Sequence, residues 1–363
     1  MRNVNTLHGI VNFPAFFPDG TYGGVKAVSA GDLSEAHVDG VVMNAYHLYQ
    51  KPGLGVIRAH GGIHAFSGWK GPVLTDSGGF QIYSLIRENP RHGEILKDKI
   101  IFRPDLKEKL IFTPEKSIQL QFAVRSDAVV CLDYCTHPGD PEDIQEKSVD
   151  TTIRWAALCK AEYEKLLKDY KYTADRRPLL FAVIQGGGSF SLREKCAKAL
   201  TAMGFDGYGF GGWPLDKDGE LVTDILKYTA ELMPEDSIKY AMGLGRPEEI
   251  AALSAMGYDL FDCVIPTREA RHNRLYVFTG PPEEADVTGA GFYKHLYILD
   301  DIYAADKAPV SDYCDCALCK GCSRAYLRHL IKTGDPLAQR LATIHNLRFY
   351  SMLMERLRAA DRA

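Results

Sequence analysis

The chain lacks several features that would place it in a specialised class of protein. It has no apolar run near the roughly 20 residues that span a membrane, and its opening, MRNVNTLHGIVNFPAFF, lacks the basic start and long apolar stretch of a secretory signal. It contains no internal repeat or low-complexity segment. With 46% hydrophobic residues, 25% charged residues and a net charge of −4, its 363 residues have an ordinary globular composition. A cytoplasmic enzyme is therefore expected.

The spacing of a disulfide framework is also missing. Five of the nine cysteines stand apart in apolar segments, which favours a reducing compartment. The others crowd into CDCALCKGC, where Cys314, Cys316 and Cys319 bring three thiols into one turn. Zinc prefers four sulfur or imidazole ligands in a tetrahedron. We predict His345, from a later helical segment, as the fourth ligand of a structural zinc site, with Cys322 as the rival.

Short apolar runs alternate with amphipathic segments over most of the chain. The apolar runs are typical of buried strands, and the alternation predicts an α/β fold with a parallel sheet. The number of units favours a closed (β/α)8 TIM barrel, expected over residues 1–300, followed by a zinc-binding subdomain and C-terminal helices over 301–363. The expected strands lie within 38–48, 71–76, 127–135, 178–187, 207–212, 238–245 and 259–268, and the expected helices within 114–126, 142–170, 191–204, 220–233 and 247–257.

Polar residues and glycines follow the apolar runs at the points where the predicted strands end. In a (β/α)8 barrel this C-terminal rim is where catalytic groups lie. A single aspartate in such a position is more often the cap of the next helix, so the hypothesis of an active site depends on several occurring together. They are Asp76, Asp133, Gln185, Gly211, Gly212 and Asp262.

Two of these carboxylates have surroundings that suit glycosyl transfer. Asp76 precedes two glycines in LTDSGGFQ, and Asp262 stands between Phe261 and Cys263 in FDCVIPTR. A pair of carboxylates can act as the nucleophile on an anomeric carbon and as the group that moves protons. The spacing by itself does not assign the two roles.

Other residues of the same segments suit a purine. Asp133 offers an acceptor and Gln185 offers both a donor and an acceptor, which matches the hydrogen-bonding edge of a guanine-like base. Phe80 and Met242 could stack on its two faces, although a methionine more often fills a core.

Arginines and a basic C-terminal region point to a nucleic acid. Arg268 and Arg271 follow Asp262 in PTREAR, where they could bind phosphates or bases beside a reacting sugar. From Lys320 onward, basic residues outnumber acidic ones. The alternative for each of these is an ordinary solvated surface.

Taken together, the motifs resemble those of the tRNA-guanine transglycosylase family, also called queuine tRNA-ribosyltransferases. The matching segments are LTDSGGFQ, VIQGG, GFDGYGFGG, MGLGRPEEI, FDCVIPTREAR, CDCALC and SRAYLRHL, in order and over nearly the whole chain. The resemblance implies a pentosyltransferase of tRNA modification that serves queuosine biosynthesis. Such an enzyme exchanges guanine at the anticodon wobble position for a 7-deazaguanine base, here expected to be preQ1-like, and commonly forms a homodimer.

The resemblance also implies a role for each candidate residue. Asp262 would be the nucleophile that bonds covalently to the ribose, and Asp76 the general acid/base. Asp133, Gln185 and Gly212 would bind the base edge, Phe80 and Met242 would stack on the base, Arg268 and Arg271 would hold the anticodon loop, and Cys314, Cys316, Cys319 and His345 would bind Zn2+.

Two departures from the family pattern bear on these expectations. Trp213-Pro214 replaces the usual Leu-Ala in the loop that senses the substituent at position 7 of the base, and the N-terminal region is expected to lack the usual opening pair of strands. Two other functions stay open. A related transglycosylase would insert a 7-deazaguanine into DNA, and a non-catalytic RNA-binding partner subunit would need neither aspartate.

Overall fold

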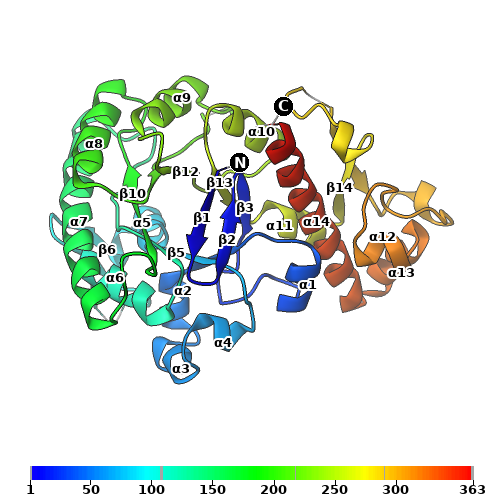
Figure 1. The fold of residues 1–363 in the computed structure, drawn as a ribbon, viewed down its shortest axis with the longest axis horizontal. Coiled ribbons are helices and arrows are strands. Elements are labelled where there is room, and N and C mark those ends of the chain that lie inside the picture. Colours follow the sequence, from blue (N-terminus) through cyan, green and yellow to red (C-terminus); the bar gives the residue numbers. More distant parts are fainter. Residues whose placement is uncertain (1, 107–108, 217, 290, 361–363) are drawn as a thin grey trace.

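The computed structural model describes residues 2–106, 109–216, 218–289 and 291–360. In this part of the chain, eight parallel strands form a barrel in the order β3-β13-β12-β11-β10-β9-β5-β4 (Figure 1). An isolated parallel bridge between Asp19 and Val42 joins the two edge strands, so the barrel is nearly closed. The predicted (β/α)8 fold is confirmed. The strands are β3 (Ala15–Pro18), β4 (Val41–Asn44), β5 (Val73–Asp76), β9 (Ala128–Val130), β10 (Leu179–Ile184), β11 (Gly207–Phe210), β12 (Ile238–Ala241) and β13 (Leu260–Cys263).

The N-terminal region differs from the expectation in two ways. β1 (Asn3–Thr6) and β2 (Gly9–Asn12) form an antiparallel hairpin, so the expected absence of an opening strand pair is wrong. These strands have four residues each, with too few apolar side chains to show a clear alternation, although Val4 and Val11 pack against the barrel. The eighth barrel strand, β3, was also missed because its proline at each end is typical of a loop. It forms because all four of its residues are buried in pairing with β13.

The amphipathic segments fold as helices outside the barrel, as predicted (Figure 1). Among the described residues, none of the helices is both long enough and apolar enough to cross a membrane. The outer helices are α6 (Pro114–Val124), α7 (Glu142–Asp169), α8 (Phe190–Met203), α9 (Thr223–Leu232) and α10 (Pro247–Ala255). Other helices of this part of the chain are α1 (Ala30–Glu35), α2 (Ala45–Gln50), α3 (Leu54–Ala59), α4 (Ile63–Ser67), α5 (Gly79–Glu88) and α11 (Ile265–Arg271). There are also 3-10 turns at Pro90–His92, Pro282–Glu284 and Asp301–Tyr303, and a small sheet of β6 (Gly93–Ile95), β7 (Ile100–Phe102) and β8 (Leu110–Phe112).

The C-terminal part builds a smaller unit against the barrel. It contains the hairpin β14 (Arg274–Phe278) and β15 (Tyr293–Tyr297), and the helices α12 (Ala317–Gly321), α13 (Arg324–Thr333) and α14 (Pro336–Ala360). Figure 1 shows α14 between the two parts, and it contacts both β3 and α10 of the barrel and β14, α12 and α13 of the smaller unit. One apolar cluster joins Leu275, Leu296 and Leu327, on both sides of the boundary predicted at residue 300, and that boundary stays a prediction.

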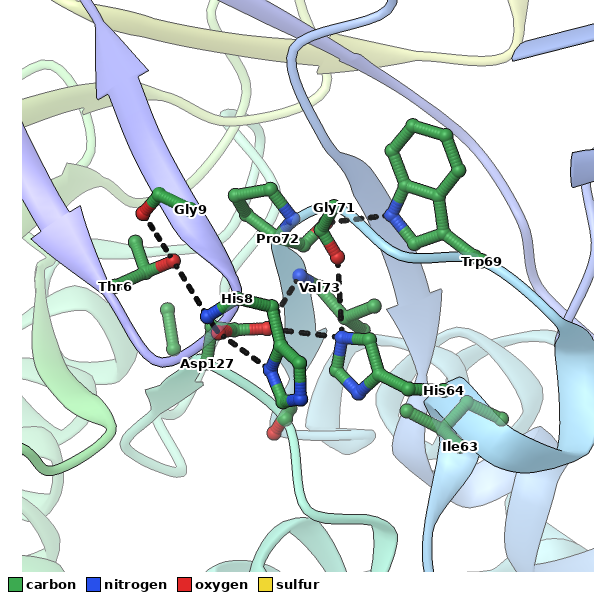
Figure 2. Close-up of polar contacts among 12 residues, drawn as sticks. Thr6, His8, Gly9, Ile63, His64, Trp69, Gly71, Pro72, Val73 and Asp127 are labelled. Carbon is green, nitrogen blue, oxygen red and sulfur yellow. Dashed lines mark hydrogen bonds and ion pairs between the residues drawn. The ribbon is translucent and has the colours of Figure 1, made fainter. Parts of the chain in front are cut away.

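The N-terminal end of the barrel is closed by a cluster of hydrogen bonds that we call the clasp, formed by His8, His64 and Asp127 (Figure 2). His8 lies in the turn of the β1–β2 hairpin and donates to Asp127 Oδ1 from its backbone N–H at 2.8 Å, with its ring Nδ1 3.0 Å from the same oxygen. His64 Nε2 is 3.2 Å from Asp127 Oδ2, which also accepts the backbone N–H of Val73 at 2.8 Å. Asp127 is 1% exposed, and the clasp ties three separate segments together.

The clasp is a hydrogen-bonded structure rather than a set of metal ligands, although three such groups could in principle hold an ion. His64 Nε2 also lies 3.1 Å from the carbonyl oxygen of Gly71, an acceptor, so this nitrogen carries a proton and has no lone pair to offer. The two imidazole rings stack with centroids 3.5 Å apart, which aims their nitrogens in parallel instead of at one point. Burial by itself would raise the pKa of Asp127. The hydrogen bonds from His64 and His8 outweigh burial and bring this pKa below its usual value, to about 2.

Asp127 is one of three aspartates that stand immediately before a barrel strand and cap the strand beside it. Asp206, before β11, accepts the N–H of Leu180 at 2.8 Å. Asp259, before β13, accepts the N–H of Lys239 at 2.8 Å. Each carboxylate satisfies a backbone donor that has no partner in the parallel ladder at that end. This end of the barrel is therefore built for stability.

Candidate active site

Asp76 ends β5 at the opposite, C-terminal rim of the barrel. Its carboxylate accepts hydrogen bonds from Asn44 Nδ2 at 2.7 Å and from the backbone N–H groups of Ala45 at 3.2 Å and Gly78 at 3.0 Å. Gly78 has φ 76°, and a Cβ there would lie 2.8 Å from Tyr46 Cβ, so only glycine suits this turn. Burial raises the pKa of Asp76 and the charge of Asp262 adds to the effect, so that it reaches about 7 despite the hydrogen bonds. The group can therefore gain or lose a proton near neutral pH.

Asp262 lies on β13, and its two carboxylate oxygens differ in their surroundings. Oδ1 accepts a hydrogen bond from the Tyr240 hydroxyl at 2.7 Å and from the backbone N–H of Gly243 at 2.8 Å. Among the described residues, Oδ2 accepts none. Burial raises the pKa of Asp262 to about 6, assisted by the charge of Asp19 and opposed by these two hydrogen bonds. Asp262 is thus held in place through one oxygen, while the other has no hydrogen bond from the described residues.

Asp76 and Asp262 are two carboxylates of the same rim, and burial raises the pKa of both. They lie on β5 and β13, which β3 and β4 separate around the barrel. Their pKa values of about 7 and about 6 mean that at neutral pH Asp262 is mostly ionised while Asp76 keeps a proton part of the time. Two carboxylates whose surroundings separate their pKa values can take different roles in one reaction.

Asp133 and Gln185 meet on the neighbouring part of the rim. Gln185 follows β10, is fully buried, and donates from Nε2 to Asp133 Oδ2 at 2.7 Å. Burial raises the pKa of Asp133 to about 6, although that hydrogen bond opposes the shift. Gln185 Oε1 is buried and accepts no hydrogen bond from the described part of the chain. Gly211 makes room for this amide, because a Cβ there would lie 2.5 Å from Gln185 Nε2. We call Asp133, Gln185 and Gly212 the polar surface of the rim. Within the described residues, it keeps an unused hydrogen-bond acceptor, Gln185 Oε1.

Aromatic side chains border this polar surface. Phe80, the second residue of α5, is 46% exposed, and its ring meets that of Trp213 edge to face with centroids 6.2 Å apart. Trp213, 41% exposed, also contacts the ring of His137 at 5.3 Å. We call Phe80, Trp213 and His137 the aromatic wall. Met242 follows β12 and packs over Gly209, where a Cβ would lie 2.6 Å from the methionine sulfur. Exposed aromatic faces in this position can stack on a flat ligand.

Both predicted RNA-binding arginines lie on α11, the helix that directly follows β13. Arg268 is exposed to solvent. Arg271 is partly buried, and its Nη1 has no hydrogen-bond partner within the described ranges. A buried donor without a hydrogen-bond partner is uncommon in a folded protein.

Three residues around the carboxylates were not singled out from the sequence. Asn44 ends β4 opposite Asp76 and Asp19 follows β3, so both obey the rule that located the other rim residues. Tyr240 lies inside β12 with its hydroxyl on Asp262. A tyrosine within an apolar strand is expected to be a core residue, and nothing in the sequence indicates that its hydroxyl binds Asp262.

The predicted metal ligands come together in the C-terminal unit. Ligand atoms of Cys314, Cys316, Cys319 and His345 all lie within 4.8 Å of one another, so this cluster could hold a metal ion. His345 Nδ1 is 3.6 Å from Cys316 Sγ and 3.3 Å from Cys319 Sγ. Its Nε2 is 2.8 Å from the carbonyl oxygen of Tyr276, which fixes the proton on Nε2 and leaves the Nδ1 lone pair facing the thiols. Cys322, the rival ligand, stays outside this group.

Comparison with known proteins extends over the barrel and the cysteine-rich unit. The family model described as queuine tRNA-ribosyltransferase matches residues 2–362. Proteins named queuine tRNA-ribosyltransferase from Acinetobacter baumannii, Acinetobacter baylyi and Thiobacillus denitrificans are each 39% identical to this chain. The matches cover 97%, 98% and 98% of this chain, and 87%, 86% and 90% of those proteins.

Proposed function

The chain belongs to the queuine tRNA-ribosyltransferase family, and on that premise we propose that it exchanges guanine at the wobble position of a tRNA anticodon for a 7-deazaguanine base. The observation that carries this proposal is the pair of rim carboxylates, Asp262 and Asp76, with pKa values of about 6 and about 7. One is mostly ionised and the other can transfer protons at neutral pH. That combination suits a double displacement at a ribose carbon.

In the first step, Asp262 Oδ2 attacks C1′ of the guanosine while the C1′–N9 bond breaks. The bonding electrons leave with the guanine, which takes a proton from the neutral form of Asp76. A covalent aspartyl-ribose intermediate results. Asp76, now ionised, removes the N9 proton of the incoming base, and N9 attacks C1′ and releases Asp262. The hydrogen bonds from Tyr240 and Gly243 hold Asp262 Oδ1 and keep Oδ2 free for both displacements.

The polar surface of Asp133, Gln185 and Gly212 would bind the base edge. Asp133 accepts hydrogen bonds from the ring N–H and exocyclic amine of a guanine-like base. The Gln185 amide and the Gly212 backbone donate hydrogen bonds to its carbonyl oxygen. Phe80 and Met242 stack on the base, which must leave the anticodon stack to enter.

The anticodon loop would be held beside the reacting ribose by Arg268 and Arg271 of α11. Arg271 Nη1 has an unused donor for this purpose. Arginine suits such a contact because its planar fork of donors fits phosphate and base edges.

The aromatic wall bears on which base is inserted. Trp213 follows Gly212 directly, and its indole contacts the Phe80 ring that we assign to the base, so we place the substituent at position 7 near this indole. An exposed indole and the Phe80 ring favour a cation above their faces. The protonated aminomethyl group of a preQ1-like base is such a cation, and the uncharged nitrile of preQ0 is not.

In the C-terminal unit, we propose that Cys314, Cys316, Cys319 and His345 bind Zn2+. Three thiolates and one imidazole are a preferred zinc donor set, and a closed set of four leaves no position for substrate. The bound ion would hold the loop before α12 onto α14 and supply stability rather than chemistry.

The assembled enzyme would be a cytoplasmic homodimer, in the compartment where tRNA is found. The homodimer is proposed from the resemblance to the family. Single exposed apolar side chains on the C-terminal unit, such as Ile302 at 76% and Tyr326 at 46%, are ordinary surface residues and carry no argument for a subunit contact.

The experiment that tests the proposal offers guanine, preQ1, preQ0 and queuine in competition for a tRNA that carries labelled guanine at the wobble position. We expect release of the label, with preQ1 preferred over preQ0, and a protein–tRNA adduct that survives denaturing electrophoresis in wild type but not in Asp262→Ala. Duplex DNA is the comparison substrate. Release of label from DNA alone would show that the proposed substrate is wrong.

A further inference from the structure

Arg193 is a buried cation that the proposed mechanism does not use. It lies in the first turn of α8 and is 1% exposed. Two other arginines are buried in the described part of the chain, and both pair with carboxylates: Arg328 with Asp301, and Arg348 with Asp315. No carboxylate of the described residues lies within ion-pair distance of Arg193.

The contacts of Arg193 are instead two backbone carbonyls and an aromatic ring. Its Nη1 donates to the Ile184 carbonyl oxygen at 2.7 Å and its Nε to that of Gly187 at 3.0 Å. Its guanidinium carbon lies 4.1 Å from the centroid of the Phe210 ring. Burial lowers the pKa of Arg193 to about 10, so the side chain is still charged at neutral pH. Burying a charge without an opposite charge beside it costs stability. A residue that keeps such a charge therefore calls for an explanation.

The two carbonyls that Arg193 binds flank Gln185. The guanidinium fork therefore fixes the backbone on both sides of the residue that donates to Asp133. The intervening Gly186, with φ 142°, packs so closely on α8 that a Cβ would lie 2.7 Å from the backbone nitrogen of Arg193. The backbone around Gln185 therefore lies directly against α8.

The charge also lies directly behind the proposed base site. A Cβ built on Gly212 would be 3.7 Å from Arg193 Nη2 and 3.5 Å from Gln185 Oε1. Gly212 thus lies beside both the guanidinium and the Gln185 amide, and we assign its backbone to the base edge. A positive charge in this desolvated place acts strongly on a bound ligand.

We propose that Arg193 is a positioning residue for base exchange, which fixes Gln185 through two carbonyls and directs an unpaired positive charge toward the base. This inference rests on the proposed function. When the C1′–N9 bond breaks, the electron pair moves onto the base, and a fixed cation behind the base edge favours that transition state over the uncharged ground state. Fixing Gln185 strengthens binding of the base, and the charge increases the rate.

The two effects can be separated with Arg193→Lys, which keeps the charge but loses the fork, and Arg193→Gln, which loses both. The matched control is Arg177→Gln. Arg177 makes a bidentate ion pair with Asp206 at the opposite end of the barrel, at 2.6 and 2.7 Å. For each protein we would measure kcat and the KM for the base in tRNA exchange, guanine affinity by calorimetry without tRNA, and thermal unfolding.

We expect both Arg193 variants to raise the KM for the base, and to weaken guanine binding, by about tenfold, the effect of losing a hydrogen bond to a charged group. Only Arg193→Gln should also lower kcat, again by about tenfold. Arg177→Gln should lower the unfolding temperature and leave kcat and KM within twofold of wild type.

Three results would overturn the inference: unchanged KM and guanine affinity in a folded Arg193 variant, an equal loss of kcat in the Lys and Gln variants, or the same kinetic change in Arg177→Gln. If Arg193→Gln does not fold, the KM and guanine affinity of Arg193→Lys decide. A wild-type protein that exchanges no base would reject the proposed function separately, and guanine affinity would still report on Arg193.

Discussion

The two ends of the barrel place the same kind of residue in opposite circumstances. Asp259 and Asp262 are three positions apart in YDLFDC, one just before β13 and the other within its C-terminal half. Asp259 caps the backbone N–H of Lys239 and pairs with Arg2, so both of its oxygens are engaged. Asp262 is held through one oxygen only. Asp259 therefore stabilises the start of the strand through both of its oxygens, whereas Asp262 keeps one oxygen without a hydrogen bond from the described residues.

The pKa values express the same difference. Asp127, in the clasp, accepts four contacts from His8, Val73 and His64, and its pKa falls to about 2. Within the described part of the chain, Asp76, at the rim, accepts only the three hydrogen bonds from Asn44, Ala45 and Gly78. These do not offset its burial, and its pKa rises to about 7. Both groups are desolvated, so the number and charge of the donors decide the direction of the shift.

The largest expected effect comes from replacing, one at a time, Asp262 of β13 and Asp259 just before it. Asp262→Ala should lower base exchange at least about 10³-fold, because the attacking group is lost. Asp259→Ala should keep the exchange rate of the folded protein and lower the free energy of unfolding by about 2 kcal/mol, because the Lys239 N–H loses its acceptor. Steady-state exchange and urea unfolding measure these. A rate loss in folded Asp259→Ala that matched Asp262→Ala would remove the distinction between the two ends.

Asp76→Asn should reduce exchange about 100-fold, because the general acid/base is lost. The pH profile sharpens this assignment. Exchange by wild type should rise as the pH passes about 6, where Asp262 loses its proton, and fall above about 7, where Asp76 loses the proton that it donates. The residual activity of Asp76→Asn should lack the fall at higher pH. A wild-type profile that is flat between pH 5 and 8 would contradict both roles.

The smallest expected effects are changes of stability with opposite signs. Folding lowers the pKa of Asp127 from 3.8 to about 2, so its contribution is present above about pH 4 and lost as the pH falls toward 2. Asp127→Asn should therefore cost about 2 kcal/mol at pH 7. Folding raises the pKa of Asp76, so stability is lost as the pH rises from 3.8 to about 7, and Asp76→Asn should recover about 1 kcal/mol at pH 8. Urea unfolding at several pH values tests both, and equal signs would contradict the comparison.

Much of this could be predicted from the sequence. The family and the barrel were identified, because seven apolar runs alternate with helices and the motifs are specific. The rule that polar residues at the C-terminal ends of the barrel strands form the site located Asp76, Asp133, Gln185 and Asp262. Their catalytic and binding roles stay predictions. The same rule applied to Asn44 would have found the donor of the 2.7 Å hydrogen bond to Asp76. Strand β3 was missed because it forms through pairing with the distant β13, and the β1–β2 hairpin was missed because its two four-residue strands hold too few apolar residues to show a pattern.

The sequence by itself determined which residue types are present and at which end of each strand they stand, since periodicity and strand direction are local properties. Only the tertiary structure decided what each group does there. Gln185 and Arg193 are both buried, and the sequence does not indicate that the guanidinium binds the carbonyls on either side of the amide. Burial, hydrogen-bond partners and pKa arise from atoms that separate parts of the chain bring together, and these set the difference between Asp259 and Asp262.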